Sequence, residues 1–290
     1  MLPELFSIGP FTVYSYGLML GIAFITANLI LNYDYEKRGL DKAYATEITL
    51  IAIIFGIIGS KLLHLVENWH AFINDPVEMA VSPGGLTFYG GLILASVAIV
   101  VYTRKTKINF FYVADITSPS LALAYGIGRI GCHLAGDGDY GIPTSLPWGV
   151  NYENGIVKPI DMFAGSDIAA GFPNGLVPND TPLHPTPIYE FLAAAALFFF
   201  LRFLLKKDWK TGQVFGIYLI FSGLFRFLVE FIRLNPRLMF GLSEAQLISL
   251  GLILCGGILF VMMKPAPSLG SLLEQYKGMS AKKAKVKKGK

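Results

Sequence analysis

Seven long apolar runs, separated by polar connections, dominate the pattern of hydrophobic and polar positions in this chain. They are centred on residues 13–32, 45–66, 85–103, 110–134, 187–205, 213–232 and 245–263. About 20 helical residues cross the hydrocarbon core of a bilayer, and each run is close to that length. A segment in lipid must satisfy its own backbone N–H and C=O groups, which favours helix. The pattern therefore predicts an all-α polytopic membrane protein with about seven transmembrane helices.

Positive charge alternates between the connections, and this alternation predicts the orientation of the chain. Segments 33–43, 103–109 and 202–211 and the tail from Lys264 together hold 18 of the 24 lysines and arginines. The connections on the other side hold only Lys158 and Arg237. Because cytoplasmic loops carry the excess of Lys and Arg, we expect the N-terminus outside and the C-terminus in the cytoplasm.

Two segments differ from the apolar runs and their short connections. The connection 137–183 is too long for a turn, is rich in Pro and Gly, and carries Trp148 and Tyr152. We expect it to fold as a cap on the outer, periplasmic face of a transmembrane domain spanning 1–266. The basic tail 267–290 is expected to be cytoplasmic, disordered and attracted to anionic lipids.

Composition agrees with lipid as the solvent and narrows the function. Hydrophobic residues make up 53% of the 290 residues and charged residues 15%, with a mean hydropathy of +0.54, whereas soluble domains are about 25% charged. Six lysines in the last ten residues account for the net charge of +4, so a nucleic-acid groove is not expected. The two cysteines do not indicate a disulfide framework.

Ionisable residues inside the runs are costly in lipid and therefore carry information about function. They are Lys61, His64, Glu67, Asp115, Arg129, His133, Glu190, Arg226, Glu230 and Arg233. Some can simply pair with each other or reach the interface from a helix end. Arg226, Glu230 and Arg233 share one helical stripe, and an Arg226–Glu230 pair alone would explain part of it. Arginines on two separate runs, with Arg129 among glycines, nevertheless favour a shared anionic lipid headgroup.

Two further polar clusters lie at the ends of the 137–183 connection. His133, Asp137 and Asp139 stand beside glycines, so they are compatible with acid–base groups or with metal ligands. One histidine and two aspartates form a thin ligand set, and a tight turn explains the glycines equally well, so we predict no metal. His184-Pro-Thr-Pro-Ile-Tyr-Glu190 opens the fifth run as either a capped helix start with an interfacial tyrosine or a partner for an arginine through Glu190.

Several motifs, in their order and spacing, resemble the prolipoprotein diacylglyceryl transferases, a family of bacterial inner-membrane enzymes. The resemblance covers residues 5–263. Its elements are Phe6-Ser-Ile-Gly-Pro, Tyr16-Gly-Leu, Gly126-x-Gly-Arg129-x-Gly131, His184-Pro-Thr-x-x-Tyr189-Glu190, Arg226-x-x-x-Glu230-x-x-Arg233 and Ser243-x-x-Gln246-x-x-Ser249. No single element is specific, but their combination is.

The resemblance implies transfer of a diacylglyceryl group from phosphatidylglycerol to the lipobox cysteine thiol in the signal-peptide region of a preprolipoprotein. A thioether forms, glycerol phosphate leaves, and no metal or organic cofactor takes part. Arg129 and Arg226 match the family's two key arginines and are expected to hold the phosphate in a site toward the periplasm. The residues expected to bind substrate are Tyr16, Gly90, Gly91, Asp137, Glu190, Glu230 and Arg233.

Departures from the family pattern leave the proton acceptor open. Tyr89-Gly90-Gly91 stands where the family has His-Gly-Gly, and Ser222 stands where it has a tyrosine. Cys132 and His133 replace the family's Asn-Phe after the first arginine, and Asp137 is a candidate substitute for its glutamate. A histidine titrates near neutrality and a tyrosine near 10, so we expect His133 rather than Tyr89 to accept the thiol proton.

Two other functions remain compatible with the residues. One is a related membrane lipid transferase with another acceptor, such as a sugar, a small thiol or a different polypeptide. The other is a non-catalytic protein that binds or transports anionic lipids. The chain lacks the paired discontinuous-helix halves of many transporters, which disfavours the transport alternative.

Overall fold

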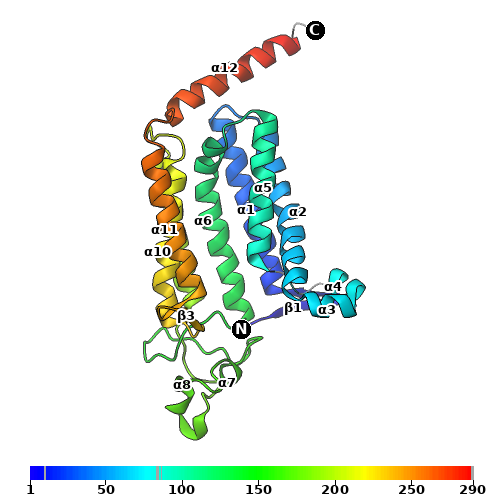
Figure 1. The fold of residues 1–290 in the computed structure, drawn as a ribbon, viewed down its shortest axis with the longest axis vertical. Helices are drawn as coiled ribbons and strands as arrows, with labels where there is room; N and C mark the ends of the chain where they lie inside the picture. Colours follow the sequence, from blue (N-terminus) through cyan, green and yellow to red (C-terminus); the bar gives the residue numbers. More distant parts are fainter. Residues whose placement is uncertain (10, 83–84, 86, 289–290) are drawn as a thin grey trace. The chain divides into compact units, whose positions relative to one another are not determined.

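The computed structural model describes residues 1–9, 11–82, 85 and 87–288 (Figure 1). Its residues form two compact units. The first contains Met1–Ala27 and Thr117–Gly270, and the second contains Asn28–Ile116 and Ser271–Lys290. Three helices contribute residues to both units: α1 (Ser15–Lys37), α6 (Phe110–Ala135) and α12 (Leu269–Lys288).

Six helices in the described part of the chain are long and apolar enough to cross a membrane. They are α1, α2 (Lys42–Glu67), α5 (Phe88–Thr106), α9 (Thr186–Leu204), α10 (Gln213–Val229) with the 3-10 turn η2 (Glu230–Ile232), and α11 (Glu244–Met262). They match six of the seven predicted runs to within a few residues. The remaining run forms α6, a helix of 26 residues with Asp115, Arg129 and His133 along it. A predominantly helical polytopic membrane protein is therefore confirmed.

The second unit is built around α2 and α5, which lie side by side (Figure 1). Gly59 of α2 faces Gly90 of α5, and a Cβ added to either glycine would collide with the backbone carbonyl of the other. Such close approach between small residues stabilises helix pairs in lipid, where no hydrophobic force drives them together. Two short helices, α3 (Trp69–Asn74) and α4 (Pro76–Val81), follow α2.

The C-terminal tail departs from the prediction of disorder, because α12 begins at Leu269. Leu269, Leu272 and Tyr276 are buried, and their spacing places them on one face of a helix. In the second unit Tyr276 packs against Tyr112, with ring centroids 5.2 Å apart, and its hydroxyl accepts a hydrogen bond from the Asn109 backbone N–H at 2.9 Å. Lysine-rich composition dominated the prediction, and this apolar spacing at the start of the tail outweighs it.

The first unit contains the helix pair α10 and α11, which lie side by side (Figure 1). Gly216 and Gly256 face each other across this contact. Between the two helices a hairpin of β3 (Arg237–Met239) and β4 (Leu242–Ser243) leads into α11. Ser243 caps that helix in a reciprocal arrangement with Gln246. A second hairpin, β1 (Glu4–Ile8) and β2 (Phe11–Tyr14), precedes α1.

The connection 137–183 is folded around its own small hydrophobic core. Its short elements are α7 (Pro159–Met162), α8 (Asp167–Ala170) and the 3-10 turn η1 (Pro173–Gly175), and it lies beyond the ends of α6, α10 and α11 (Figure 1). The core consists of Tyr140, Tyr152, Phe163, Ala169, Val177 and Leu183. Tyr152, which the sequence singled out in this segment, therefore lies in its interior, whereas Trp148 is exposed.

Candidate active site

Glu190, near the start of α9, joins the two arginines singled out in the sequence. Its Oε1 lies 2.7 Å from Arg226 Nη1 of α10, and its Oε2 lies 3.2 Å from Arg129 Nε of α6. Glu190 is only 4% exposed, so both ion pairs are shielded from solvent. Although Arg129 and Arg226 are 97 positions apart in the chain, their guanidiniums converge on one carboxylate. The predicted convergence of the two side chains is therefore present in the structure.

The same centre is extended along α10 by Glu230. Its Oε2 lies 3.5 Å from Arg226 Nη2, one helical turn away, as the stripe in the sequence predicts. Its Oε1 accepts hydrogen bonds from Ser243 Oγ at 2.9 Å and from the amide of Asn235. Glu230 is fully buried. A buried carboxylate needs such partners, because desolvation without them is costly.

Asp139 extends the centre in the other direction and was not among the predicted site residues. Its carboxylate pairs with Arg129 through one oxygen and with Arg233 through the other. The Thr186 hydroxyl donates to its backbone carbonyl, which ties the loop after α6 to the start of α9. Three guanidiniums and three carboxylates thus alternate in one network: Arg233, Asp139, Arg129, Glu190, Arg226 and Glu230.

Arg233 of the network retains a feature that suits an additional anion. Arg233 is 6% exposed, and its Nη1 has no hydrogen-bond partner among the residues that the structure describes. A buried guanidinium donor without an acceptor is unfavourable, so this atom is a natural donor to a bound oxyanion. Tyr125 supports the other arginine: its ring lies 5.0 Å below Arg129 Cζ, and its hydroxyl donates to Glu190 Oε1 at 2.7 Å.

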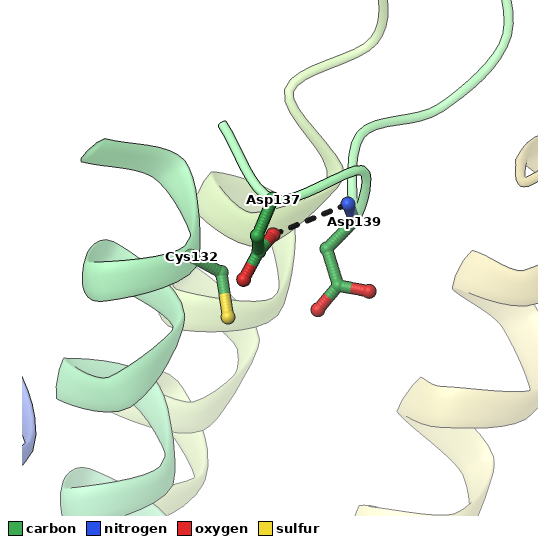
Figure 2. Close-up of side chains that lie close together, drawn as sticks. All are labelled: Cys132, Asp137 and Asp139. Carbon is green, nitrogen blue, oxygen red and sulfur yellow. Dashed lines mark hydrogen bonds between the residues drawn. The ribbon is translucent and has the colours of Figure 1, made fainter. Parts of the chain in front are cut away.

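Cys132, Asp137 and Asp139 gather where α6 runs into the 137–183 connection, with their side chains directed toward one another (Figure 2). One ligand-type atom from each lies within 4.8 Å of the others. Both oxygens of Asp139 already face guanidiniums, and a cation placed beside two arginines would be repelled. The group is therefore better described as part of the ion-pair network than as a metal centre. Cys132 and Cys255 are both free thiols.

The two aspartates of this group have opposite electrostatic environments. Burial alone would raise the pKa of Asp139, but the guanidiniums of Arg129 and Arg233 outweigh it and hold that pKa at about 2. For Asp137, burial raises the pKa, and the negative charge of Asp139 raises it further. Asp139 is therefore a permanent anion near neutral pH, whereas Asp137 takes up a proton more readily than an ordinary aspartate.

His133 faces the core of the 137–183 connection. Its Nδ1 is 2.9 Å from the Tyr152 hydroxyl, and the two rings meet edge to face. Asp137, in the loop just after α6, stands near Cys132. Tyr16, the second residue of α1, lies beside Gly131, where an added Cβ would be 3.3 Å from the Tyr16 ring. These three predicted residues all surround the end of α6.

Tyr89, Gly90 and Gly91 belong to the second unit and open α5. Gly90 faces Gly59, and a Cβ on Gly91 would collide with Ser60 Oγ and approach the Gly56 carbonyl at 2.6 Å. Tyr89 packs edge to face on Phe88, with ring centroids 5.7 Å apart. The structure thus gives both glycines a packing role in the contact between α2 and α5. Their expected substrate-binding role, and that of Tyr89, stay predictions.

Asp139 of the network, and Tyr125 in contact with it, were not predicted from the sequence as site residues. Asp139 belonged to a cluster that a tight turn explained equally well. Tyr125 lies in an apolar run, one turn before Arg129 and therefore on the same face of α6. That spacing is the signal that identifies it.

The chain is similar to known proteins over most of its length. The family model described as prolipoprotein diacylglyceryl transferase matches residues 3–262. The phosphatidylglycerol–prolipoprotein diacylglyceryl transferase of Clostridium tetani is 35% identical over 261 residues, which cover 90% of this chain and 97% of that protein. Transferase 2 of Clostridium perfringens is 35% identical over 85% of this chain and 89% of its own length. The Proteus mirabilis enzyme is 31% identical over 89% and 90%.

Proposed function

Since the chain belongs to the prolipoprotein diacylglyceryl transferase family, we propose that it transfers the diacylglyceryl group of phosphatidylglycerol to the lipobox cysteine of preprolipoproteins. The convergence of Arg129 and Arg226 on Glu190 is the observation that carries this proposal. It supports a site for one phosphate between α6, α9 and α10. This reaction is the first step of lipoprotein maturation.

The proposed step is a displacement at the glycerol carbon that carries the phosphate. The cysteine thiolate attacks this carbon, a carbon–sulfur bond forms, and the carbon–oxygen bond breaks with its electron pair on the phosphate oxygen. Glycerol phosphate leaves, and the thiol proton passes to an acceptor on the protein. These participants balance the reaction, so no metal or organic cofactor is required.

The arginines serve the leaving group in this proposal. Arg129 and Arg226 bind the phosphate oxygens, and the unpartnered Arg233 Nη1 is a third available donor. Negative charge develops on the phosphate in the transition state, and fixed guanidiniums in a shielded site stabilise it without reorganisation. Glu190, Glu230 and Asp139 hold the three guanidiniums in place before substrate binds. Two further predicted residues, Tyr16 and Asp137, are proposed to line the same pocket.

For the proton acceptor we retain His133, with Tyr89 as the alternative. The hydrogen-bond contact between His133 Nδ1 and the Tyr152 hydroxyl supports a fixed ring with its Nε2 available for the thiol proton. A test compares His133→Gln with Tyr89→Phe over pH 5 to 9. Loss of the acidic limb of the pH–rate profile in His133→Gln alone is expected, and an unchanged profile in that variant contradicts the assignment.

We also propose how the chain is arranged in the membrane. All seven predicted segments span the inner membrane, with α6 as the seventh, the N-terminus and the 137–183 cap on the periplasmic side, and the C-terminus in the cytoplasm. The distribution of lysines and arginines supports it. Cysteine labelling from outside should modify a single cysteine at Ser145 in the cap but not one at Lys105 in a Cys-free background, and the reverse result would invert the topology.

The direct test of function is an assay with phosphatidylglycerol vesicles, a lipobox peptide and the purified full-length protein. Mass spectrometry should detect a peptide heavier by one diacylglyceryl group, together with glycerol phosphate. If phosphatidylglycerol is consumed while the peptide stays unmodified, the acceptor is another molecule. Binding of phosphatidylglycerol without release of glycerol phosphate would support the non-catalytic alternative.

A further inference from the structure

The tip of the β3–β4 hairpin is apolar and exposed. It consists of three consecutive residues, Leu238, Met239 and Phe240, which are 61%, 59% and 89% exposed. The hairpin joins α10 to α11 at the end of these helices that lies nearest the 137–183 connection (Figure 1). A contiguous apolar tip of this kind indicates contact with something outside the chain.

The turn at the tip has a backbone conformation that does not suit its aromatic residue. Met239 pairs with Leu242. Phe240 and Gly241 are therefore the two central residues of the turn, and their φ angles are 54° and 71°. Positive φ at both positions is what a type I′ turn requires, but Asn or Asp is preferred at the first of them and a bulky aromatic residue is strained there. A strained residue at an exposed tip points to a role for its ring.

Hydrogen bonds fix the base of the hairpin on the ends of the two helices. Ser243 donates from its hydroxyl to Glu230 Oε1 at 2.9 Å, and Asn235, just before β3, donates from its amide to the same oxygen. Arg237, the first residue of β3, donates from Nη1 to Gln246 Oε1 at 2.7 Å. The hairpin is therefore attached to the first turn of α11 and to a buried carboxylate of the arginine network.

The position of the hairpin along the chain places it at the surface of the bilayer. α11 begins at Glu244, directly after β4, and has 19 residues. Such a helix is about 28 Å long, close to the thickness of the hydrocarbon core, so its two ends lie at the two interfaces. Three residues of strand extend about 10 Å, and interfacial elements reach about 5–10 Å into the boundary between headgroups and acyl chains. The tip is long enough to reach that boundary.

We propose that the β3–β4 hairpin inserts Leu238, Met239 and Phe240 into the lipid leaflet at its end of the spans. The proposal requires that α10 and α11 cross the bilayer and does not depend on the transfer reaction. Arg237, which is exposed at the base of the hairpin, lies among the headgroups while the three apolar side chains lie below it. Because Ser243 ties the hairpin to Glu230, the inserted tip holds the arginine network at a constant depth.

Two other surroundings fit the hairpin less well. An extended peptide that adds a strand needs a free strand edge, and β3 and β4, with three and two residues, offer few backbone groups. Water would surround three adjacent apolar side chains at a turn where asparagine would relieve the strain. Lipid accounts for both the composition of the tip and its strained turn.

Spin labels on single cysteines test the depth of the tip. The full-length protein carries Cys132→Ala and Cys255→Ala, which removes its two native thiols, and the label is attached at Phe240→Cys or Met239→Cys. Each protein is placed as a single copy in nanodiscs of phosphatidylcholine and phosphatidylglycerol. Collisions of the label with oxygen, which concentrates in lipid, and with a water-soluble nickel chelate are then measured.

Two exposed apolar positions in the same cysteine-free background serve as references. Leu254→Cys places the label in the middle of α11, where the wild-type side chain is 64% exposed, and Leu176→Cys places it in the 137–183 connection, where the side chain is 44% exposed. The label at 254 should collide mostly with oxygen and the label at 176 mostly with the chelate. Both tip labels should collide with the chelate less than the label at 176, at a depth of about 5–10 Å.

One further variant separates the ring from the turn. Phe240→Asn suits the positive φ and removes the apolar ring. In this variant the label at Met239→Cys should shift toward the collision rates measured at 176, because the tip has lost its most exposed apolar group. An unchanged label would contradict a role for the ring in insertion.

Three other outcomes would overturn the proposal. Equal chelate collisions at positions 240 and 176 would place the tip in water. Low collision rates with both reagents would mean that protein covers the tip, and protection that appears only after a lipobox peptide is added would assign the tip to the peptide. None of these measurements uses turnover, so failure of the proposed function would leave the result unaffected.

Discussion

Two groups of helices in this protein are held together by different kinds of contact. In the second unit α2 and α5 meet through Gly59 and Gly90, whose backbones touch with no side chain between them. In the first unit the parts of α6, α9 and α10 nearest the 137–183 connection meet through buried arginines and carboxylates. Glycine contacts need only close packing, whereas buried charges require every partner to be in place.

This difference shows which unusual residues in an apolar helix indicate a functional site and which indicate helix packing. Glycines in a helix destabilise it relative to alanine, and a contact such as that of α2 with α5 is sufficient reason for their presence. Ion pairs inside a membrane protein are not needed for packing alone, because apolar side chains of similar volume stabilise equally well or better. The charged contact therefore points to function, and the glycine contact points to architecture.

The largest effect on activity is expected when one guanidinium of the charged contact is removed. Arg129→Ala and Arg226→Ala should each lower transfer from phosphatidylglycerol by about 100-fold or more, as for loss of a fixed donor to a developing oxyanion. Arg104→Ala, at an exposed position of α5, serves as the control and should keep wild-type turnover. The thermal midpoint in detergent is measured in parallel, and full activity in either site variant contradicts the phosphate role.

A substitution in the glycine contact should lower the free energy of unfolding. Gly90→Ala places a methyl group against the Gly59 backbone, which cannot move cheaply, so unfolding should become easier by about 1–3 kcal/mol. Gly56→Ala on α2 is the matched control, because its added Cβ meets nothing within 4 Å. It should be neutral or stabilising by up to about 1 kcal/mol. Equal destabilisation by both substitutions would argue against a specific contact at Gly90.

Asp139 and Asp137 are expected to differ in how their ionisation affects the stability of the folded protein. The pKa of Asp139 is about 2 in the folded protein, below the unfolded value near 3.9. Its ionised form therefore stabilises the fold above about pH 4, and this contribution is lost as pH falls from 4 to 2. We expect Asp139→Asn to lower the free energy of unfolding at pH 7 by about 2 kcal/mol. The variant should also lose less stability than wild type when the pH is lowered through that range.

The smallest effect is expected at Asp137, two residues away. Burial raises its folded pKa, so its stabilising contribution is complete only below the unfolded pKa and declines as pH rises through the folded one. Asp137→Asn removes the charge that folding opposes and should leave stability at pH 7 unchanged or slightly higher. Urea unfolding of both variants at pH 7 measures the contrast, and a loss at position 137 as large as that at 139 would refute it.

Much of the fold could be predicted from the sequence, because a segment that crosses lipid must be a long apolar helix. The long apolar runs marked the helices, and the spacing of Arg226, Glu230 and Arg233 placed them on one stripe. The tail was misjudged because six lysines outweighed the apolar spacing of Leu269, Leu272 and Tyr276, which a composition argument ignores. Periodicity within a helix was the better guide.

The charged residues of the site could be predicted from the sequence, but the contacts between them could not. Arg129, Arg226 and Glu190 stood out because charge in an apolar run is costly. Asp139 did not, because it lies in a loop where an aspartate is ordinary, and only the fold directs it to Arg129 and Arg233. The contact between Gly90 and Gly59 was equally hidden, since no pattern within one helix reveals which glycine it faces in another.

The equal numbers of guanidiniums and carboxylates in the arginine network have a consequence for turnover. Breaking the carbon–oxygen bond converts a phosphodiester with one negative charge into a monoester that carries up to two. Three uncompensated cations would retain that product, whereas Asp139, Glu190 and Glu230 bring the net charge of the six side chains to zero. In the proposed reaction the carboxylates should therefore favour release of glycerol phosphate, because no external anion is needed to balance the guanidiniums once the product has left.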